Sequence, residues 1–318
     1  MQLCGGNATL ASVFSLQTRQ GRSATTQWSL TKTMQRVTNE PAKASVSSSP
    51  EAFTLIELLV VAGMLAVLAV TLAPALAKSG GRSGRITCFN NKRQVEAACA
   101  LYSAEWNDWL TPNAPVGAVS PTGQPVGWCP GQENWSASIY NTAPDYYRTN
   151  VLGPYVGNVD VYKCPNDKLL SDNGERIRSI SMNGAMCGDL PANVRFNIQS
   201  FMSGFRVYSK TADLTVPRPA NTWVFCDESM FTLNDGYLQV ALSLPGYPDV
   251  PAAYDVGGNC FSFADAHVEY REWVWPGTTS AGLRNCPYRY GVTTSSSSWG
   301  SSGADTDWVW LRQHSSAQ

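Results

Sequence analysis

One long apolar segment, residues 53–77, limits what this chain can fold into. Its sequence is FTLIELLVVAGMLAVLAVTLAPALA, and Glu57 is the single charged residue in it. About 20 apolar residues in a helix span the hydrocarbon core of a bilayer, so the segment predicts a transmembrane helix. A carboxylate in lipid is costly and normally serves a partner or a function, which makes Glu57 a candidate functional residue. The alternative is an acid that snorkels at the end of an ordinary membrane anchor.

The residues before this segment have a different composition. Residues 1–52 are rich in Ser, Thr and Gln, lack hydrophobic periodicity, and carry more basic than acidic residues. Such a stretch is typical of a processing segment that lies outside the fold. Met34 would give a leader of more ordinary length, and we expect translation to start there. The positive flank favours a cytoplasmic N-terminus, although basic residues also follow the apolar segment, so charge counting alone leaves the orientation open.

Composition and cysteine usage describe the rest of the chain. The net charge is −1 and charged residues make up 15% of the 318 residues, which argues against a nucleic-acid partner. Eight cysteines remain if Cys4 leaves with the leader, and their scattered spacing does not indicate a zinc site. An even number in an exported domain predicts disulfides, and buried free thiols are the alternative. The candidates are Cys88, Cys99, Cys129, Cys164, Cys187, Cys226, Cys260 and Cys286.

Helical spacing continues after the apolar segment and predicts a long spine over residues 53–110. Apolar residues recur at helical intervals through 85–105, and the helix should end before Pro112. Gly80 and Gly81 separate the two stretches. Each glycine costs a helix up to about 1 kcal/mol relative to alanine, so we expect a bend or short break near 80–84.

Residues 111–292 predict an α+β head with a small antiparallel sheet and long loops. Residues 293–304 are rich in Ser and Gly and predict a flexible linker within the terminal segment 293–318. We expect Trp308 and Trp310 in the tail to dock back on the head. The clearest strand-like runs are 223–228, 237–244, 259–264 and 267–275.

The start of the apolar segment resembles that of type IV prepilins and type II secretion pseudopilins. In that family a basic leader is cut just before a Phe, and the fifth mature residue is Glu. The matching cut falls between Ala52 and Phe53, the matching acid is Glu57, and Pro74 stands where pilins commonly carry a helix-kinking proline. The resemblance implies cleavage by prepilin peptidase and N-methylation of Phe53. An uncleaved anchor is the alternative, because Ala52 occupies a position where the peptidase usually meets Gly.

This resemblance implies a structural subunit without catalytic activity or a cofactor. The implied fold is pilin-like, with a long N-terminal helix, transmembrane in its first half, packed on an α+β head. The implied location is the inner membrane, crossed once, with the N-terminus cytoplasmic and the head periplasmic or extracellular. Its implied partners are other pilin or pseudopilin subunits, the prepilin peptidase and the inner-membrane assembly platform. Within an assembly, Glu57 of one subunit would neutralise the Phe53 amine of a neighbour.

Segments of the head resemble a large pilin-like family of Planctomycetes, Verrucomicrobia and Lentisphaerae. Two departures from that family stand out. Ala266 stands where the family has Gly, at a position that predicts a left-handed backbone costing alanine on the order of 1 kcal/mol. Asp255 replaces the histidine of the family signature. The matching segments are residues 88–112, VYKCPND (161–167), SISMNG (179–184), PANTWVFCDE (219–228) and NCFSFADAHVEY (259–270).

Helix geometry restricts the disulfides of the spine. Cys88 and Cys99 are eleven residues apart, which places them on one helix face but about 16 Å apart along the axis. A disulfide joins Cα atoms no more than about 7 Å apart, so these two cannot pair while the helix is intact. We expect each to reach the head, with Cys164 in the CPND turn as the partner of Cys88.

Three further patterns leave alternatives open. Asp265, His267 and Glu269 share one strand face, which could hold a metal or do acid–base chemistry but is more typical of a solvated hairpin. Calcium is possible at acidic loops without any EF-hand spacing. Eleven tryptophans suit core packing, and exposed ones could bind sugars. The alternative function is therefore a membrane-anchored surface module that contacts glycans. The acidic residues are Asp227, Glu228, Asp235, Asp249 and Asp255.

Overall fold

The computed structural model describes residues 54–115, 126–129, 131–277, 282–285 and 303–318, with the backbone alone at 72–82, 200, 201 and 285. Several predicted features fall outside these residues. They are Ala52, Phe53, Cys286, the linker over 293–302 and the side chain of Pro74.

Helix α1 runs without interruption from Leu55 to Glu105, over 51 residues. The helix continues through Gly80 and Gly81, so the short break predicted near 80–84 is absent, while the predicted bend stays a prediction. Breaking a helix would leave up to four N–H and four C=O groups unpaired on either side of the break, which outweighs about 1 kcal/mol for each glycine. The predicted end before Pro112 is confirmed, and Asn107 and Asp108 turn the chain there with positive φ angles of 53° and 62°.

The two parts of α1 differ in what surrounds their side chains. Apolar residues near its start are exposed, with 80% of Leu55 and 74% of Val70 accessible. Further along, Val95, Ala98 and Tyr102 are buried against the head. Within the described part of the chain, no helix combines the length and the apolar character that a membrane crossing requires. The predicted span 53–77 extends beyond the residues whose side chains are described.

The head is built on a five-stranded sheet in the order β5-β3-β4-β6-β7. Three neighbouring pairs are antiparallel, and β3 with β5 is parallel. The sheet is thus mixed, which corrects the prediction of a purely antiparallel one. The strands are β3 (Ile180–Asn183), β4 (Trp223–Asp227), β5 (Tyr237–Leu238), β6 (Gly258–Phe263) and β7 (Val268–Glu272).

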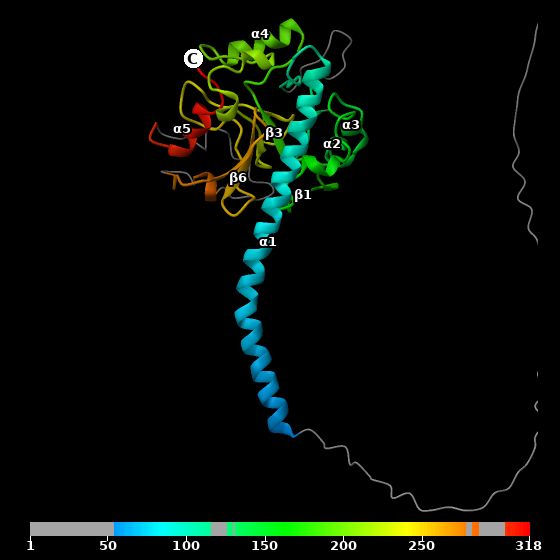
Figure 1. The fold of residues 1–318 in the computed structure, drawn as a ribbon, viewed down its shortest axis with the longest axis vertical. Coiled ribbons are helices and arrows are strands. Elements are labelled where there is room, and N and C mark those ends of the chain that lie inside the picture. Colours follow the sequence, from blue (N-terminus) through cyan, green and yellow to red (C-terminus); the bar gives the residue numbers. More distant parts are fainter. Residues whose placement is uncertain (1–53, 116–125, 130, 278–281, 286–302) are drawn as a thin grey trace, which may run out of the picture. The chain divides into compact units, whose positions relative to one another are not determined.

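The predicted strands at 223–228, 259–264 and 267–275 match β4, β6 and β7, whereas 237–244 does not form one long strand. Only Tyr237–Leu238 pair with β3, and the next amide, that of Gln239, donates 2.6 Å to the Asp249 carboxylate. Figure 1 shows the later part of α1 lying beside β3 and β6. A separate hairpin joins β1 (Leu170–Ser171) to β2 (Gly174–Glu175).

Short helices connect these strands and close the head. The α-helices are α2 (Ile139–Thr142), α3 (Asp145–Arg148), α4 (Ala192–Phe201) and α5 (Thr306–Gln313). The 3-10 turns are η1 (Val159–Tyr162), η2 (Thr211–Asp213), η3 (Pro219–Asn221) and η4 (Leu283–Asn285).

Aromatic side chains fill the core of the head. Trp128, Trp223 and Trp273 are fully buried, which confirms packing as the use of these three. The predicted docking of the tail is confirmed as well. Trp308 is buried and its indole N–H donates 2.8 Å to the Ala241 carbonyl, while the Trp310 ring contacts Phe261 edge-on at 4.9 Å.

Candidate functional site

Glu57 closes the first turn of α1. Its carboxylate accepts hydrogen bonds from the Thr54 amide (2.9 Å) and the Thr54 hydroxyl (2.8 Å), and the Thr54 hydroxyl in turn accepts from the Glu57 amide at 3.3 Å. These reciprocal bonds satisfy amides that a helix N-terminus otherwise leaves unpaired. Both residues are exposed, so within one chain Glu57 acts as a helix cap at the surface.

A buried ion pair joins α1 to the sheet. The Lys92 ammonium donates to the Asp227 carboxylate at 2.7 Å, and both side chains are almost completely withdrawn from solvent. The same ammonium donates 3.2 Å to the sulfur of Cys88, one turn earlier on α1. The Ser179 hydroxyl donates 2.9 Å to the Asp227 carboxylate. The backbone amide of Asp227 donates 2.9 Å to the side-chain oxygen of Asn259. The charges are therefore paired and hydrogen-bonded, as buried charges must be.

Cys88 lies in a cluster of three buried cysteines with Cys164 and Cys260. The Cys164 amide donates 2.7 Å to the Ser179 hydroxyl, which itself bonds Asp227, so one serine positions both the turn and the carboxylate. The Cys260 thiol donates 3.2 Å to the carboxylate of Asp255.

Asp255, where the resembled family has a histidine, ties the same region to α1. Its buried carboxylate pairs with the Arg85 guanidinium at 2.9 Å and accepts from the Asn166 amide at 3.2 Å. The guanidinium lies over the Tyr270 ring, 3.5 Å from its centroid.

These neighbours shift the protonation equilibria of the cluster. Hydrogen bonds from Cys164 and Cys260, together with the Lys92 ammonium, lower the pKa of the Cys88 thiol well below its ordinary value. Hydrogen bonding to Cys88 and burial raise the pKa of Cys164 and Cys260. Burial raises the pKa of Asp227, against the opposing effect of Lys92. Cys88 is therefore the thiol that ionises first and the nucleophile in any thiol exchange.

The arrangement allows two kinds of chemistry. The sulfurs of Cys88 and Cys164 and a carboxylate oxygen of Asp227 all lie within 4.8 Å of one another, so this buried group could hold a metal ion. Thiolate ligands suit zinc better than calcium, and the Lys92 ammonium competes with any cation placed there. The same proximity places the predicted partners Cys88 and Cys164 side by side, here as free thiols.

The other described cysteines lie in the main core of the head. Cys99, Cys129, Cys187 and Cys226 are buried free thiols that pack with apolar and aromatic side chains. Cys99 contacts the head as expected, and burial raises its pKa well above the ordinary value. Disulfides at these positions stay a prediction.

The predicted hairpin residues lie at the surface. Asp265 and His267 pair with each other at 2.5 Å, and the imidazole stacks on Phe263 with ring centroids 4.2 Å apart. Glu269 is exposed on β7. Ala266 has a φ of 71°, so the predicted left-handed backbone is confirmed.

The five acidic residues considered for calcium separate into two places, and Asp235 belongs with Glu228 and Asp249, on both of which it acts electrostatically. Asp227 and Asp255 belong to the thiol cluster described above. Glu228 is buried beside the β-sheet, where one carboxylate oxygen accepts from Ser181 and the other has no hydrogen-bond partner. Burial and then the nearby Asp249 raise the pKa of Glu228, and burial raises that of Asp249 to about 7.

Sequence reasoning missed the roles of Lys92 and Glu96. Both are buried on α1, at four-residue intervals from Cys88. The signal was present, because residues four apart share a helix face, and a charge on the face that carries Val95 and Cys99 has to find a partner in the head.

No model of a protein family matches the sequence, and no curated protein or solved structure matches it either.

Proposed function

We propose that this protein is a structural pilin-like subunit of a type II secretion or type IV pilus-like assembly, without catalytic activity of its own. The observation that carries the proposal is the contrast along α1. Residues 55–70 are exposed although almost all are apolar, while the part from Cys88 onward has one face buried against the head. A helix that is apolar on all sides needs lipid or neighbouring helices around it. We infer that the membrane and other subunits supply these surroundings.

Glu57 supplies the specificity of that packing. After cleavage before Phe53, the new amine lies four residues from Glu57, and neither charge is stable alone in lipid. Pairing the amine of one subunit with Glu57 of another removes a penalty of several kcal/mol and sets the register between helices. The partners are thus other subunits, the prepilin peptidase and the inner-membrane assembly platform. The protein would cross the inner membrane once, with its N-terminus cytoplasmic and its head outside.

Self-association in membranes tests this proposal. Glu57→Gln keeps an oxygen that can cap the helix but removes the charge. After crosslinking in membranes, the ladder of oligomers on a gel should therefore be much weaker than that of the wild type. Thr54→Val is the matched control, because it removes the hydroxyl of the cap and leaves the charge of Glu57 in place. Ladders from Thr54→Val should resemble those of the wild type. If Glu57→Gln gives unchanged ladders while the protein stays in the membrane, the assembly role is wrong.

The glycan-contacting anchor is the alternative, and one residue favours it. Trp106 is 51% exposed and stacks on the buried Tyr102 with centroids 5.6 Å apart, so one aromatic ring is held at the surface. Stacking on sugars uses such surfaces. The anchor function would be supported by two results together. The protein would bind soluble oligosaccharides and lose that binding in Trp106→Ala, and Glu57→Gln would leave the crosslinked oligomers unchanged.

Calcium remains a separate proposal for the head. Calcium takes oxygen ligands, and the unpaired oxygen of Glu228 near Asp249 offers them without thiols. Calcium titration of the wild type against Glu228→Gln, followed by thermal unfolding, tests it. A stabilisation by calcium that is equal in both proteins would exclude Glu228 as a ligand.

A further inference from the structure

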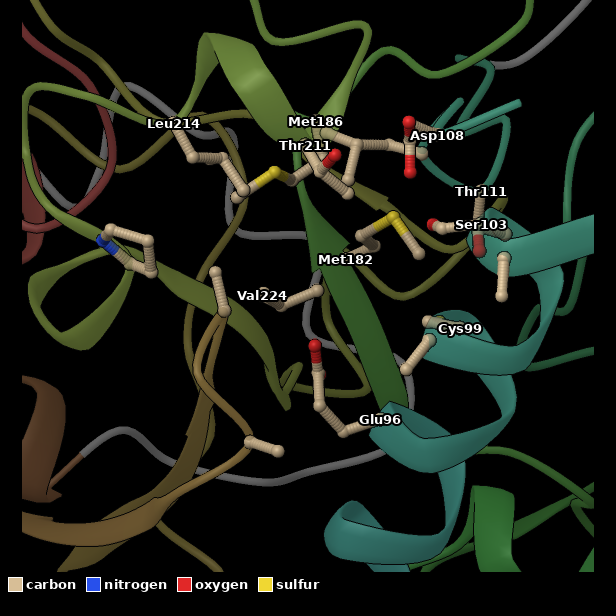
Figure 2. Close-up of a pocket in the computed structure, with 16 residues that line it drawn as sticks. Glu96, Cys99, Ser103, Asp108, Thr111, Met182, Met186, Thr211, Leu214 and Val224 are labelled. Atoms are coloured by element: carbon tan, nitrogen blue, oxygen red, sulfur yellow. The ribbon is translucent and has the colours of Figure 1, made fainter. Parts of the chain in front are cut away.

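A cavity of about 320 Å³ lies between α1 and the sheet, apart from the thiol cluster. Figure 2 shows its walls, with Glu96 and Cys99 on α1, and with Met182, Met186 and Val224 across the cavity from that helix. Cavities of about 300 to 1,000 Å³ hold small-molecule ligands. The volume therefore admits a small molecule.

Glu96 gives this mostly apolar cavity a carboxyl group. The side chain is 7% exposed and points from α1 toward Val224 (Figure 2). One carboxylate oxygen accepts 3.0 Å from the Ser262 hydroxyl on β6. Burial raises the pKa of Glu96 to about 8, and Asp265 adds to the rise. A pKa of about 8 favours the protonated form of this carboxyl group at neutral pH, and no Lys or Arg is among the described lining residues to keep it ionised.

A second polar group in the wall is the hydroxyl of Thr111. It is buried, with the residue 3% exposed, and lies within hydrogen-bonding reach of the Cys99 thiol. Among the described residues that line the cavity, Glu96 and Asp108 are acidic and none is Lys or Arg.

We propose that this cavity binds a small primary ammonium ligand with an unbranched apolar body. The ammonium group would pair with Glu96, and the body would lie against Met182, Met186 and Leu214. A carboxylate ligand would meet two acidic groups and no base. A quaternary ammonium would need aromatic faces, which the described lining lacks. This site is independent of the assembly role proposed above.

Binding of n-hexylamine to the full chain in lipid nanodiscs tests the proposal by calorimetry, with empty nanodiscs as the blank. 1-Hexanol and hexanoate are the matched probes, since they share the chain and differ in the polar group. We expect saturable binding of hexylamine alone. Because Glu96 is protonated in the free protein and ionised beside the ammonium, binding should release close to one proton at neutral pH. Comparing heats in two buffers of different ionisation enthalpy measures that proton.

Variants localise the site. Glu96→Gln keeps the shape and removes the charge, so hexylamine should bind at least about tenfold more weakly and release no proton. Glu269→Gln, on the exposed face of β7, should leave both unchanged. Equal affinity for hexanol and hexylamine, binding without proton release, or wild-type binding by a folded Glu96→Gln would each overturn the proposal.

Discussion

Lys92 and Asp227 form a 2.7 Å ion pair that is closed off from solvent where α1 meets strand β4. The two residues are 135 positions apart in the chain, so the pair joins the spine helix to the centre of the head sheet. A pair of this kind matters most when one partner is lost, because the remaining charge stays buried.

Removing either partner should destabilise the head, and to different extents. Asp227→Asn leaves a buried ammonium and should lower the free energy of unfolding by about 3–5 kcal/mol. Lys92→Met should cost less, because burial already raises the pKa of Asp227 and the carboxyl can take up a proton. Urea unfolding followed by tryptophan fluorescence measures both. The exposed Lys168→Met is the control, and an effect of Asp227→Asn no larger than that control would contradict a structural role for the pair.

The disulfide prediction concerns Cys88 and Cys164. In protein isolated from its membrane, non-reduced peptide mapping should find these two joined, because the acidic Cys88 thiol lies beside Cys164. Cys260 is the competing partner, so Cys260→Ala should leave the bond intact. A Cys88–Cys260 bond in the wild type, or free thiols at both Cys88 and Cys164, would refute the pairing.

Processing should remove the leader. N-terminal sequencing and mass spectrometry of the membrane-purified protein should give a mature chain that begins at Phe53 and carries N-methylation. A protein expressed without a prepilin peptidase is the control and should retain the leader. A mature chain that still contains residues 34–52 in the presence of the peptidase would show that Ala52 is not a cleavage position.

Glu96 should make stability depend on pH. Its pKa rises from 4.5 to about 8 in the folded protein, so the folded state holds a proton that the unfolded state releases. The resulting stability is fully present below about pH 4.5 and is lost as the pH rises through about 8. Urea unfolding at several pH values between these limits should show a steeper decline for the wild type than for Glu96→Gln. If the free energy of unfolding fell with pH equally in both proteins, Glu96 would be ionised in the folded protein.

Replacing Ala266 by glycine should stabilise the β6–β7 hairpin. A φ of 71° costs alanine about 1 kcal/mol that glycine avoids. Ala264→Gly is the control, since Ala264 lacks a positive φ and glycine there only adds freedom to the unfolded chain. Thermal unfolding should shift upward for Ala266→Gly and downward for Ala264→Gly. A downward shift for both would show that the backbone at Ala266 is not strained.

Local sequence patterns predicted the local features of this fold. The left-handed backbone at Ala266 and the end of α1 before Pro112 each depend on a few neighbouring residues. The strand predicted at 237–244 failed because Asp249, ten positions later, captures the amide of Gln239.

Contacts between distant segments were beyond such patterns. The residues around Lys92 give no sign that its side chain is buried, since its partner Asp227 lies 135 positions later in the sequence. The cavity beside Glu96 likewise needs α1, β3 and β4 in place before it exists. The sequence could indicate that the face of α1 is mixed in polarity, but not which groups in the head would meet it.

The unbroken course of α1 has a mechanical consequence. A helix of 51 residues is about 75 Å long, and it contains no joint at which a pull along its axis could be relieved. Tension on its apolar end would pass directly to Arg85 and Lys92, whose partners are Asp255, in the turn before β6, and Asp227 on β4. The load would then reach two neighbouring strands of the head sheet, since β4 pairs with β6.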